Sequence, residues 1–506
     1  MRSSCSTKPK ETNPRMSADP PAEVPTRSLD PEDWSELRAL GHRMLDDMVD
    51  HLEGVRDRPV WRKLPAELAE ALKTPLPRAP QGLDAAYRDF QRLVLPYGTG
   101  NVHPRFMGWV HGGGTAVGML AEMLAAGLNA NLGGRDHAPI EVERQVVRWS
   151  AEMLGLPETT SGLLVTGTSI ANLIGLLVAR RASLGDAVRK RGLAGAPLTA
   201  YTSAAAHGCI PRAMDMSGLG TEALRLVPCG ADHRMDVAAL AAAIARDRAA
   251  GAIPFLVIGT AGTVDTGAID DLAAIARLCR DQGLWFHVDG AFGALAALAP
   301  GLKPLLAGIE DADSVAFDFH KWAQAPYDAG IILVRDQAAQ MAAFAAPAAY
   351  LRREARGLAG GHPWPCDLGP DLSRGFRALK VWLTLKTYGA DRLGEAIQQT
   401  CDLAQSLAAR VDAAPELERL APVPLNIVCF RYRGPAGGSL PNDLDRLNVE
   451  IVADLQESGV AAPSTTMIGG QLAIRAALVN HRTGASDIEA LVEGVLARGA
   501  ARAVLT

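Results

Sequence analysis

The sequence lacks the features that mark membrane, secreted and nucleic-acid-binding proteins. No apolar run reaches the roughly 18 residues that a membrane-spanning helix needs, and the first residues are polar where a signal peptide has an apolar core. Its 51 Lys and Arg nearly balance its 56 Asp and Glu, so the net charge is −5 over 506 residues. This balance leaves no excess of positive charge for a polyanion. We therefore expect a cytoplasmic protein without membrane or nucleic-acid partners.

Cysteine is also scarce. The seven cysteines are odd in number, scattered, and free of Cys-x-x-Cys spacing. This pattern is typical of reduced thiols rather than of a disulfide framework or a zinc site. We expect no metal.

The chain divides by pattern into four parts. Residues 1–28 are rich in Pro and Ser, which predicts a disordered tail. Residues 29–119 form an N-terminal helical segment that opens with the amphipathic stretch "DPEDWSELRALGHRMLDDMVDHLEGV". The apolar stripe of that stretch needs a surface to cover it, either a partner subunit or the core of the same chain. Residues 120–375 form a large domain, and residues 376–506 form a smaller α+β domain.

The large domain alternates short apolar strands with Ala-rich helices. The expected strands are "GLLV", "LTAYTS", "PFLVIGT", "GLWFHVD", "SVAFDF" and "AGIILV". This alternation predicts an α/β fold with a mixed, mostly parallel sheet, and ligands bind such sheets beyond the carboxyl ends of the strands.

Polar residues follow several of these strands. Lys321 comes directly after "VAFDFH" and before another buried strand. A lysine is usually a solvated surface charge, but burial opposes its charged form unless the amine is neutral or covalently engaged. Asp289 ends "FHVD" beside small residues, and His207 follows "LTAYTS". Thr168 and Ser169 start a helix after "LLVTG", where backbone N–H groups and hydroxyls suit a phosphate.

Each of these signals is weak alone, since an aspartate or a Gly-Thr-Ser turn is more often a helix cap. Together they fit one cofactor, pyridoxal 5'-phosphate (PLP). PLP needs a lysine for its imine, an acid for its pyridine nitrogen and a cradle for its phosphate.

The same residues lie in a series of longer motifs, which are, in chain order, "HPRFMGW", "TGTSIANL", "AAAHGCIPRA", "GTAGTVDTGAIDDL", "WFHVDGAFGA", "DSVAFDFHKW" and "SRGFRALKVWLTLKTYG". In these motifs and their order, the chain resembles the group II PLP-dependent amino acid decarboxylases, in particular the aromatic-L-amino-acid branch. The resemblance implies PLP fold type I (aspartate aminotransferase-like) and a homodimer. It also implies the reaction, which is the decarboxylation of an L-amino acid, with an aromatic one expected, to an amine and carbon dioxide.

The resemblance also implies roles for single residues. Lys321 is the Schiff-base lysine, Asp289 the partner of the ring nitrogen, and His207 the histidine stacked on the ring. The other expected cofactor contacts are Thr168, Ser169, Thr263, Ala291 and His320. Trp109 and His111, in "MGWVHGG", are expected to line the substrate pocket.

Two departures from the family pattern bear on the reaction. Gly133 and Gly134 stand near a position where the aromatic branch carries a bulky aromatic, which suggests a different pocket. The Gly- and Pro-rich stretch 350–374 is expected to be a lid, and it lacks the family's tyrosine after Tyr350. We therefore expect proton delivery by His207 or His362, or the formation of some aldehyde.

Other functions remain open at this stage. An aminotransferase or a carbon–carbon lyase would use the same cofactor residues. Decarboxylation-dependent oxidative deamination would give an aldehyde. A regulator that binds PLP without turnover is the non-catalytic alternative.

Overall fold

The computed structural model describes residues 28–345, 354–435 and 443–503. Contacts divide the chain into the compact units Met1–Met48 and Val49–Thr506. The predicted tail of residues 1–28 lies outside the described residues except for its last one. This division does not test the boundaries expected at residues 120 and 376, which stay predictions.

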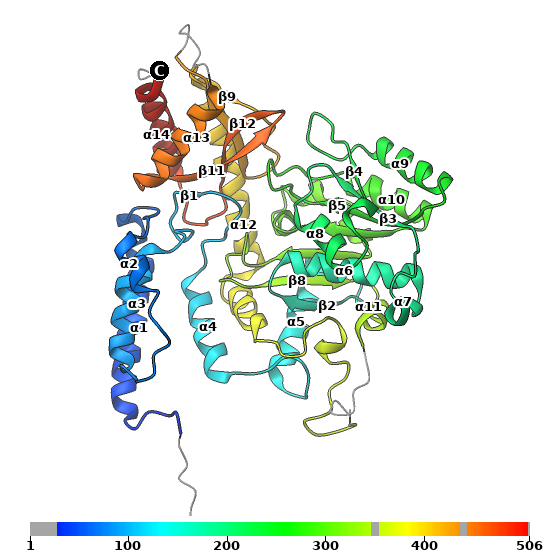
Figure 1. Ribbon diagram of the computed structural model, residues 1–506, viewed down its shortest axis with the longest axis horizontal. Coiled ribbons are helices and arrows are strands. Elements are labelled where there is room, and N and C mark those ends of the chain that lie inside the picture. The colour runs from blue at the N-terminus through cyan, green and yellow to red at the C-terminus, as the bar shows by residue number, and fades with distance from the viewer. Residues whose placement is uncertain (1–27, 346–353, 436–442, 504–506) are drawn as a thin grey trace, which may run out of the picture. The chain divides into compact units, whose positions relative to one another are not determined.

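The larger unit contains a seven-stranded sheet with the order β2-β8-β7-β6-β5-β3-β4. Figure 1 labels its strands β2, β8, β5, β3 and β4. The strands are β2 (Ser161–Val165), β3 (Leu198–Ser203), β4 (Leu224–Val227), β5 (Ile253–Thr260), β6 (Trp285–Asp289), β7 (Ser314–Asp318) and β8 (Gly330–Val334). Strand β8 runs antiparallel to both of its neighbours, and the other pairs are parallel. The mixed, mostly parallel sheet predicted from the sequence is confirmed; β4 was not predicted.

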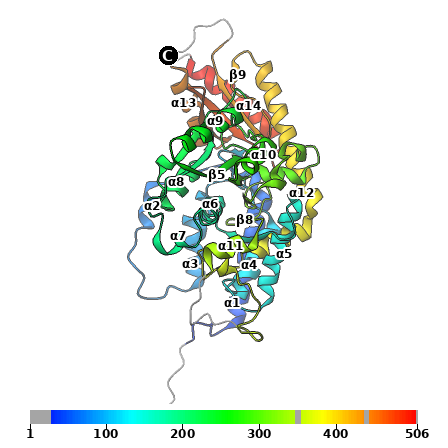
Figure 2. The ribbon, with the colours of Figure 1, turned by 90° about the vertical axis from the view of Figure 1, so that its right-hand side faces the viewer.

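Alternation along the strands gives this sheet two apolar faces. Leu256 and Ile258 of β5 pack in a core that holds residues of α6 and α8, whereas Val257 between them packs with residues of α9 and α10. Helices therefore cover both faces, as a largely parallel sheet requires. Figure 2 shows α6 beside β8 and β5.

The helices that accompany this sheet lie before, between and after its strands in the chain. They are α5 (Ala138–Met153), α6 (Thr168–Leu184), α7 (Ala187–Arg191), α8 (Cys209–Met216), α9 (Val237–Ala249), α10 (Leu272–Gln282) and α11 (Gln337–Phe344). Helix α6 starts directly after β2, so its N-terminus lies at the carboxyl end of that strand.

A smaller five-stranded sheet has the order β1-β11-β12-β10-β9. Its strands are β1 (Phe106–Met107), β9 (Leu417–Arg419), β10 (Ile427–Tyr432), β11 (Ala462–Ile468) and β12 (Gln471–Ala477). Helices α13 (Leu444–Glu457) and α14 (Ala485–Ala503) contact strands of this sheet. Because β1 pairs in parallel with β11, a segment that we assigned to the N-terminal part contributes to this sheet.

Helix α12 (Arg377–Ala413) connects the two sheets. It contacts α5 on one side and β9, β10 and α14 on the other. Gly389, at φ 75°, interrupts its helical backbone, so two helical stretches meet at this residue.

The N-terminal part contains α1 (Trp34–Glu53), α2 (Ala66–Ala71), α3 (Leu83–Leu93) and α4 (Ala116–Leu128). No residue of α1 is buried. Among the described helices, none is both long and apolar enough to cross a membrane.

Candidate active site

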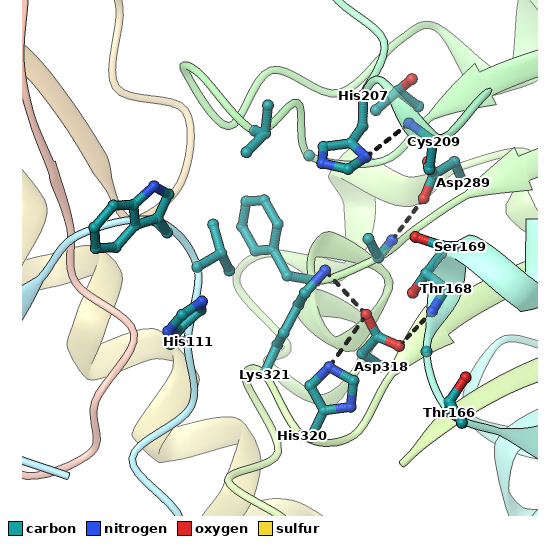
Figure 3. Close-up of a pocket in the computed structure, with 18 of the residues that line it drawn as sticks. His111, Thr166, Thr168, Ser169, His207, Cys209, Asp289, Asp318, His320 and Lys321 are labelled. Atoms are coloured by element: carbon teal, nitrogen blue, oxygen red, sulfur yellow. Dashed lines mark hydrogen bonds and ion pairs between the residues drawn. The ribbon is translucent and has the colours of Figure 1, made fainter. Parts of the chain in front are cut away.

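A pocket of about 490 Å³ opens at the carboxyl ends of β2, β5, β6 and β7 (Figure 3). It brings together all of the predicted site residues except Thr263. These lining residues are Trp109, His111, Thr168, Ser169, His207, Asp289, Ala291, His320 and Lys321. They come from segments spread over more than 200 residues of chain. The strands of the large sheet bring most of them together at one edge, whereas Trp109 and His111 come from the segment after β1 of the small sheet.

Lys321 and Asp318 form an ion pair inside this pocket. The Lys321 Nζ lies 2.9 Å from Asp318 Oδ2, and the Asp318 side chain is 3% exposed. The other Asp318 oxygen accepts a hydrogen bond of 2.8 Å from the backbone N–H of Thr168 (Figure 3). Asp318 therefore ties the lysine to the start of α6.

His320 lies next to the Asp318 carboxylate as well. Its Nδ1 accepts from the backbone N–H of Ala329 at 3.0 Å, which assigns the ring proton of the neutral form to Nε2. That Nε2 lies 3.6 Å from Asp318 Oδ2. Burial lowers the pKa of His320, and Asp318 opposes the shift.

Asp289 is buried at the end of β6 with a donor on each oxygen. Asn172 Nδ2 donates to Oδ2 at 3.0 Å, and the backbone N–H of Ala291 donates to Oδ1 at 3.1 Å. Burial raises the pKa of Asp289, while the Lys321 charge and these two hydrogen bonds lower it. A cation bound beside Asp289 would favour the carboxylate further.

His207 is exposed and its ring is held by the start of α8. Its Nδ1 accepts from the backbone N–H of Cys209 at 3.1 Å, so the neutral ring carries its proton on Nε2. Burial, and then the Asp289 charge, raise the pKa of Cys209 to about 12. The thiol next to Asp289 therefore stays protonated at neutral pH.

Aromatic rings form one wall of the pocket. His111 stacks with Trp109 at 6.0 Å between centroids and meets Tyr327 edge-on at 5.9 Å, and Tyr327 packs on His320 at 4.3 Å. Trp109 has the left-handed φ of 50°, which is unusual for a bulky residue.

Arg475 of β12 holds the backbone of this wall. It is 3% exposed and donates to the Trp109 carbonyl at 3.1 Å. It also donates to the carbonyl of Val264, another lining residue, at 2.8 Å. The small sheet thus positions two pocket segments.

Unpartnered hydroxyls test whether the pocket suits a phosphate-bearing cofactor. The Oγ1 atoms of Thr168 and Thr260 are buried without a hydrogen-bond partner, and both residues line the pocket. A buried hydroxyl without a partner costs free energy that a ligand's acceptors would recover. The residues present therefore fit PLP.

Several residues singled out by the sequence lie elsewhere. Thr263 is buried, and its hydroxyl bonds to Thr266 and the N–H of Ala268, so its place beside the cofactor stays a prediction. A Cβ on Gly133 would overlap the Leu372 carbonyl, and one on Gly134 would meet the Trp364 ring at 2.6 Å. Neither glycine lines the pocket, so both serve packing of the chain there.

Part of the predicted lid packs against the protein, whereas residues 354–358 are exposed. Trp364 is 1% exposed and donates to the Gly360 carbonyl at 2.6 Å, and the Arg135 guanidinium lies over its ring. The exposed His362 stacks on Trp364, and neither residue lines the pocket. The packing of Trp364 does not test the expected lid, which stays a prediction; Tyr350 lies outside the described residues.

Three functional residues were missed from the sequence: Asp318, Asn172 and Tyr327. For Asp318 a signal was present, because an acid three residues before a buried lysine offers it a counter-ion. The roles of Asn172 and Tyr327 depend on contacts with segments far along the chain.

Comparison with known families decides the class. The model of the pyridoxal-dependent decarboxylase conserved domain matches residues 65–433, more than half of the chain. The chain belongs to the pyridoxal-dependent decarboxylase family. It is therefore a PLP-dependent enzyme of the amino acid decarboxylase class, with the α/β fold that the family shares.

Individual relatives agree with this assignment. The chain is 32% identical to an aromatic-L-amino-acid decarboxylase of Bacillus atrophaeus, over 90% of this chain and 93% of that one. It is 29% identical to a phenylacetaldehyde synthase of Arabidopsis thaliana, over 89% and 93%. The crystal structure of an Oryza sativa TDC with PLP and tryptamine has a TM-score of 0.85, with 26% identity and coverage of 93% and 99%.

Proposed function

We propose that this decarboxylase converts an aromatic L-amino acid to the corresponding amine and carbon dioxide. One observation carries the proposal: a single pocket joins Lys321, Asp289 and His207 to an aromatic wall. The B. atrophaeus relative and the TDC solved with tryptamine support an aromatic substrate.

The residues of the chain divide the work of holding the cofactor. Lys321 supplies the amine for covalent attachment, and the hydroxyls of Thr168 and Ser169 at the start of α6 suit the phosphate. The Asp289 carboxylate keeps the ring nitrogen protonated by its charge. When bound, PLP provides a ring that accepts the electron pair left as carbon dioxide departs.

His207 and the aromatic wall act on the substrate. With Nδ1 engaged by Cys209, the imidazole of His207 is fixed in one orientation and presents Nε2–H as a donor. The rings of Trp109 and His111 offer flat apolar surface to an aromatic side chain. Such positioning determines which bond at the substrate's α-carbon breaks.

A substrate screen tests the function. Purified protein loaded with PLP should release carbon dioxide from tryptophan, tyrosine, phenylalanine or 3,4-dihydroxyphenylalanine, with one amine formed per carbon dioxide. Lys321→Ala is the inactive control. Release from glutamate or 2,4-diaminobutyrate, with none from the aromatic amino acids, would contradict the proposal.

Aldehyde formation is the second candidate. Residues 354–374 contain no tyrosine, and the A. thaliana relative is a phenylacetaldehyde synthase. In the same screen, this route consumes oxygen and yields aldehyde, ammonia and peroxide with the carbon dioxide. An amine yield that equals carbon dioxide, with no oxygen uptake, excludes it.

We also propose that the enzyme is a cytoplasmic homodimer. Four large apolar residues of α4 are 39–59% exposed: Leu120, Met123, Leu124 and Leu128. Clustered apolar surface of this kind marks an interface. Light scattering should give twice the chain mass for the parent protein. Leu124→Glu should shift the measured mass towards that of the monomer. Leu226→Glu is the control, because Leu226 is an exposed leucine of β4. A monomeric parent would contradict the dimer.

A further inference from the structure

A line of hydrogen-bonded side chains runs along one face of the sheet, from Trp285 at the start of β6 to Asp289 at its end. Trp285 Nε1 donates to Ser314 Oγ at 2.9 Å, and Ser314 Oγ lies 2.8 Å from His287 Nδ1. His287 Nε2 lies 2.8 Å from Asn172 Oδ1, and Asn172 Nδ2 donates to Asp289 Oδ2 at 3.0 Å. The last four residues are each at most 3% exposed. Apart from Asp289, none of these residues lines the pocket.

The two ends of this line set the direction of its bonds, because the Trp285 N–H can only donate and the Asp289 carboxylate can only accept. An indole N–H can only donate, so Ser314 Oγ accepts from Trp285 and has its own proton free to give to His287. His287 Nδ1 is then an acceptor, and Nε2 carries the ring proton. That proton goes to Asn172, which can accept only through its amide oxygen.

The direction of these hydrogen bonds determines which atoms of the Asn172 amide face Asp289. With its oxygen turned to His287, the Asn172 amide must present N–H groups on its other side. One of them bonds Asp289, and another lies 3.4 Å from the Cys209 sulfur. A flipped amide would place an oxygen against the buried carboxylate, which repels it.

The environment of His287 keeps the ring neutral. Complete burial lowers the pKa of His287 to about 3. A Cβ on Gly175 of α6 would lie 2.8 Å from His287 Cε1, so the backbone there closes directly on the ring. No water-sized space is left for an alternative partner on that side.

We propose that His287 and Ser314 are positioning residues, which orient the Asn172 amide so that it stabilises Asp289 as the carboxylate that binds the cofactor's ring nitrogen. The proposal rests on the PLP site proposed above. It does not depend on which amino acid is the substrate. Neither residue touches the reacting atoms, and their effect passes through Asn172.

The first test reads the tautomer in the cofactor-free protein. Nitrogen-15 histidine NMR at pH 7, with the His287→Gln spectrum used for assignment, should show His287 protonated on Nε2 alone. A proton on Nδ1, or on both nitrogens, would overturn the proposed direction.

The second test compares two matched serine variants. Ser314→Ala removes the donor to His287, whereas Ser150→Ala removes an equally buried hydroxyl that bonds Val146 of its own helix. We expect Ser314→Ala to weaken PLP binding roughly tenfold or more, as loss of an outer partner does for bound metals. Ser150→Ala should bind PLP normally. Equal PLP affinity in the two variants would overturn the proposal.

Rescue by a conservative substitution separates positioning from packing. Glutamine at 287 can still donate to the Asn172 oxygen, whereas phenylalanine fills the space without a donor. His287→Gln should therefore retain PLP affinity within a few-fold, and His287→Phe should lose at least about tenfold. Equal loss in both, at equal thermal stability, would contradict the role. Failure of the aromatic substrate screen, with these binding results intact, would refute only the proposed reaction.

Discussion

Lys321 Nζ and Asp318 Oδ2 lie 2.9 Å apart, so the lysine that would bind the cofactor already has a buried partner. The same carboxylate takes the Thr168 N–H, at the helix start expected to receive the phosphate. Asp318 therefore contacts both the expected covalent anchor and an expected phosphate donor.

Replacing this carboxylate should speed cofactor capture. In Asp318→Asn the Lys321 amine loses its counter-charge, and the phosphate meets one negative charge fewer. We expect PLP to attach roughly tenfold faster at pH 7, as about 1.4 kcal/mol would give. The growth of visible absorbance after mixing measures it. Asp313→Asn, at the other end of β7, is the control; slower capture by Asp318→Asn would contradict this explanation.

Lys321 should be the site of covalent attachment. Borohydride reduction of the yellow enzyme, followed by peptide mapping, should place the cofactor on Lys321. Lys380 is the control, because it also pairs with a carboxylate, Glu122, but lies outside the pocket, and its side chain is 3% exposed against 21% for Lys321. A label on Lys380, or loss of labelling in Lys380→Ala, would refute the assignment.

Asp289→Asn should lose turnover even when saturating PLP keeps its site filled, although it should bind PLP more weakly than the parent. The amide has nearly the same shape but no charge with which to hold the ring proton, and loss of such a preorganised charge costs about a hundredfold in kcat. Asp270→Asn is the control, since Asp270 is equally buried and accepts from the N–H groups of Met235 and Thr260. It should lose about 1–3 kcal/mol of stability. Near-parental kcat in Asp289→Asn would show a capping role only.

Acid should destabilise the protein through His287. Its folded pKa of about 3 lies below the unfolded value of 6.5, so between these pH values the unfolded chain binds the additional proton. Stability therefore falls as the pH drops from 6.5 towards 3, by about 2 kcal/mol at pH 5 from this residue. Urea unfolding at pH 7 and pH 5 measures it. His287→Gln should show a smaller loss, and an unchanged loss would exclude His287 as its source.

Tyr327 should contribute to proton delivery. It lines the pocket with 48% of its surface exposed, and the surrounding protein still raises the pKa of its phenol, which therefore keeps its proton at neutral pH. We expect Tyr327→Phe to lower the rate of amine formation about tenfold or more and to raise the aldehyde share, since general acids contribute at least that much. Tyr388→Phe in α12, outside the pocket, is the control. An unchanged rate and product ratio would rule out this role.

Much of the large sheet was predictable because buried parallel strands are apolar throughout and end in distinctive polar residues. Strand β4 escaped because only its ends are buried, which leaves a short signal. Strand β1 has two residues and exists through pairing with β11, about 350 residues later, which no local pattern records.

By itself the sequence determined which chemistry the chain carries: a lysine, an aspartate and a histidine after strands, and a phosphate-type turn before a helix. Side chains at the carboxyl ends of parallel strands must converge, and this is why the order of motifs was sufficient. The tertiary structure alone decided their partners. The Asp318–Lys321 pair, the Asn172 amide on Asp289 and the burial of Trp364 arise from packing between distant segments. At these contacts, each buried polar group forms a hydrogen bond or ion pair with a group that the fold places next to it.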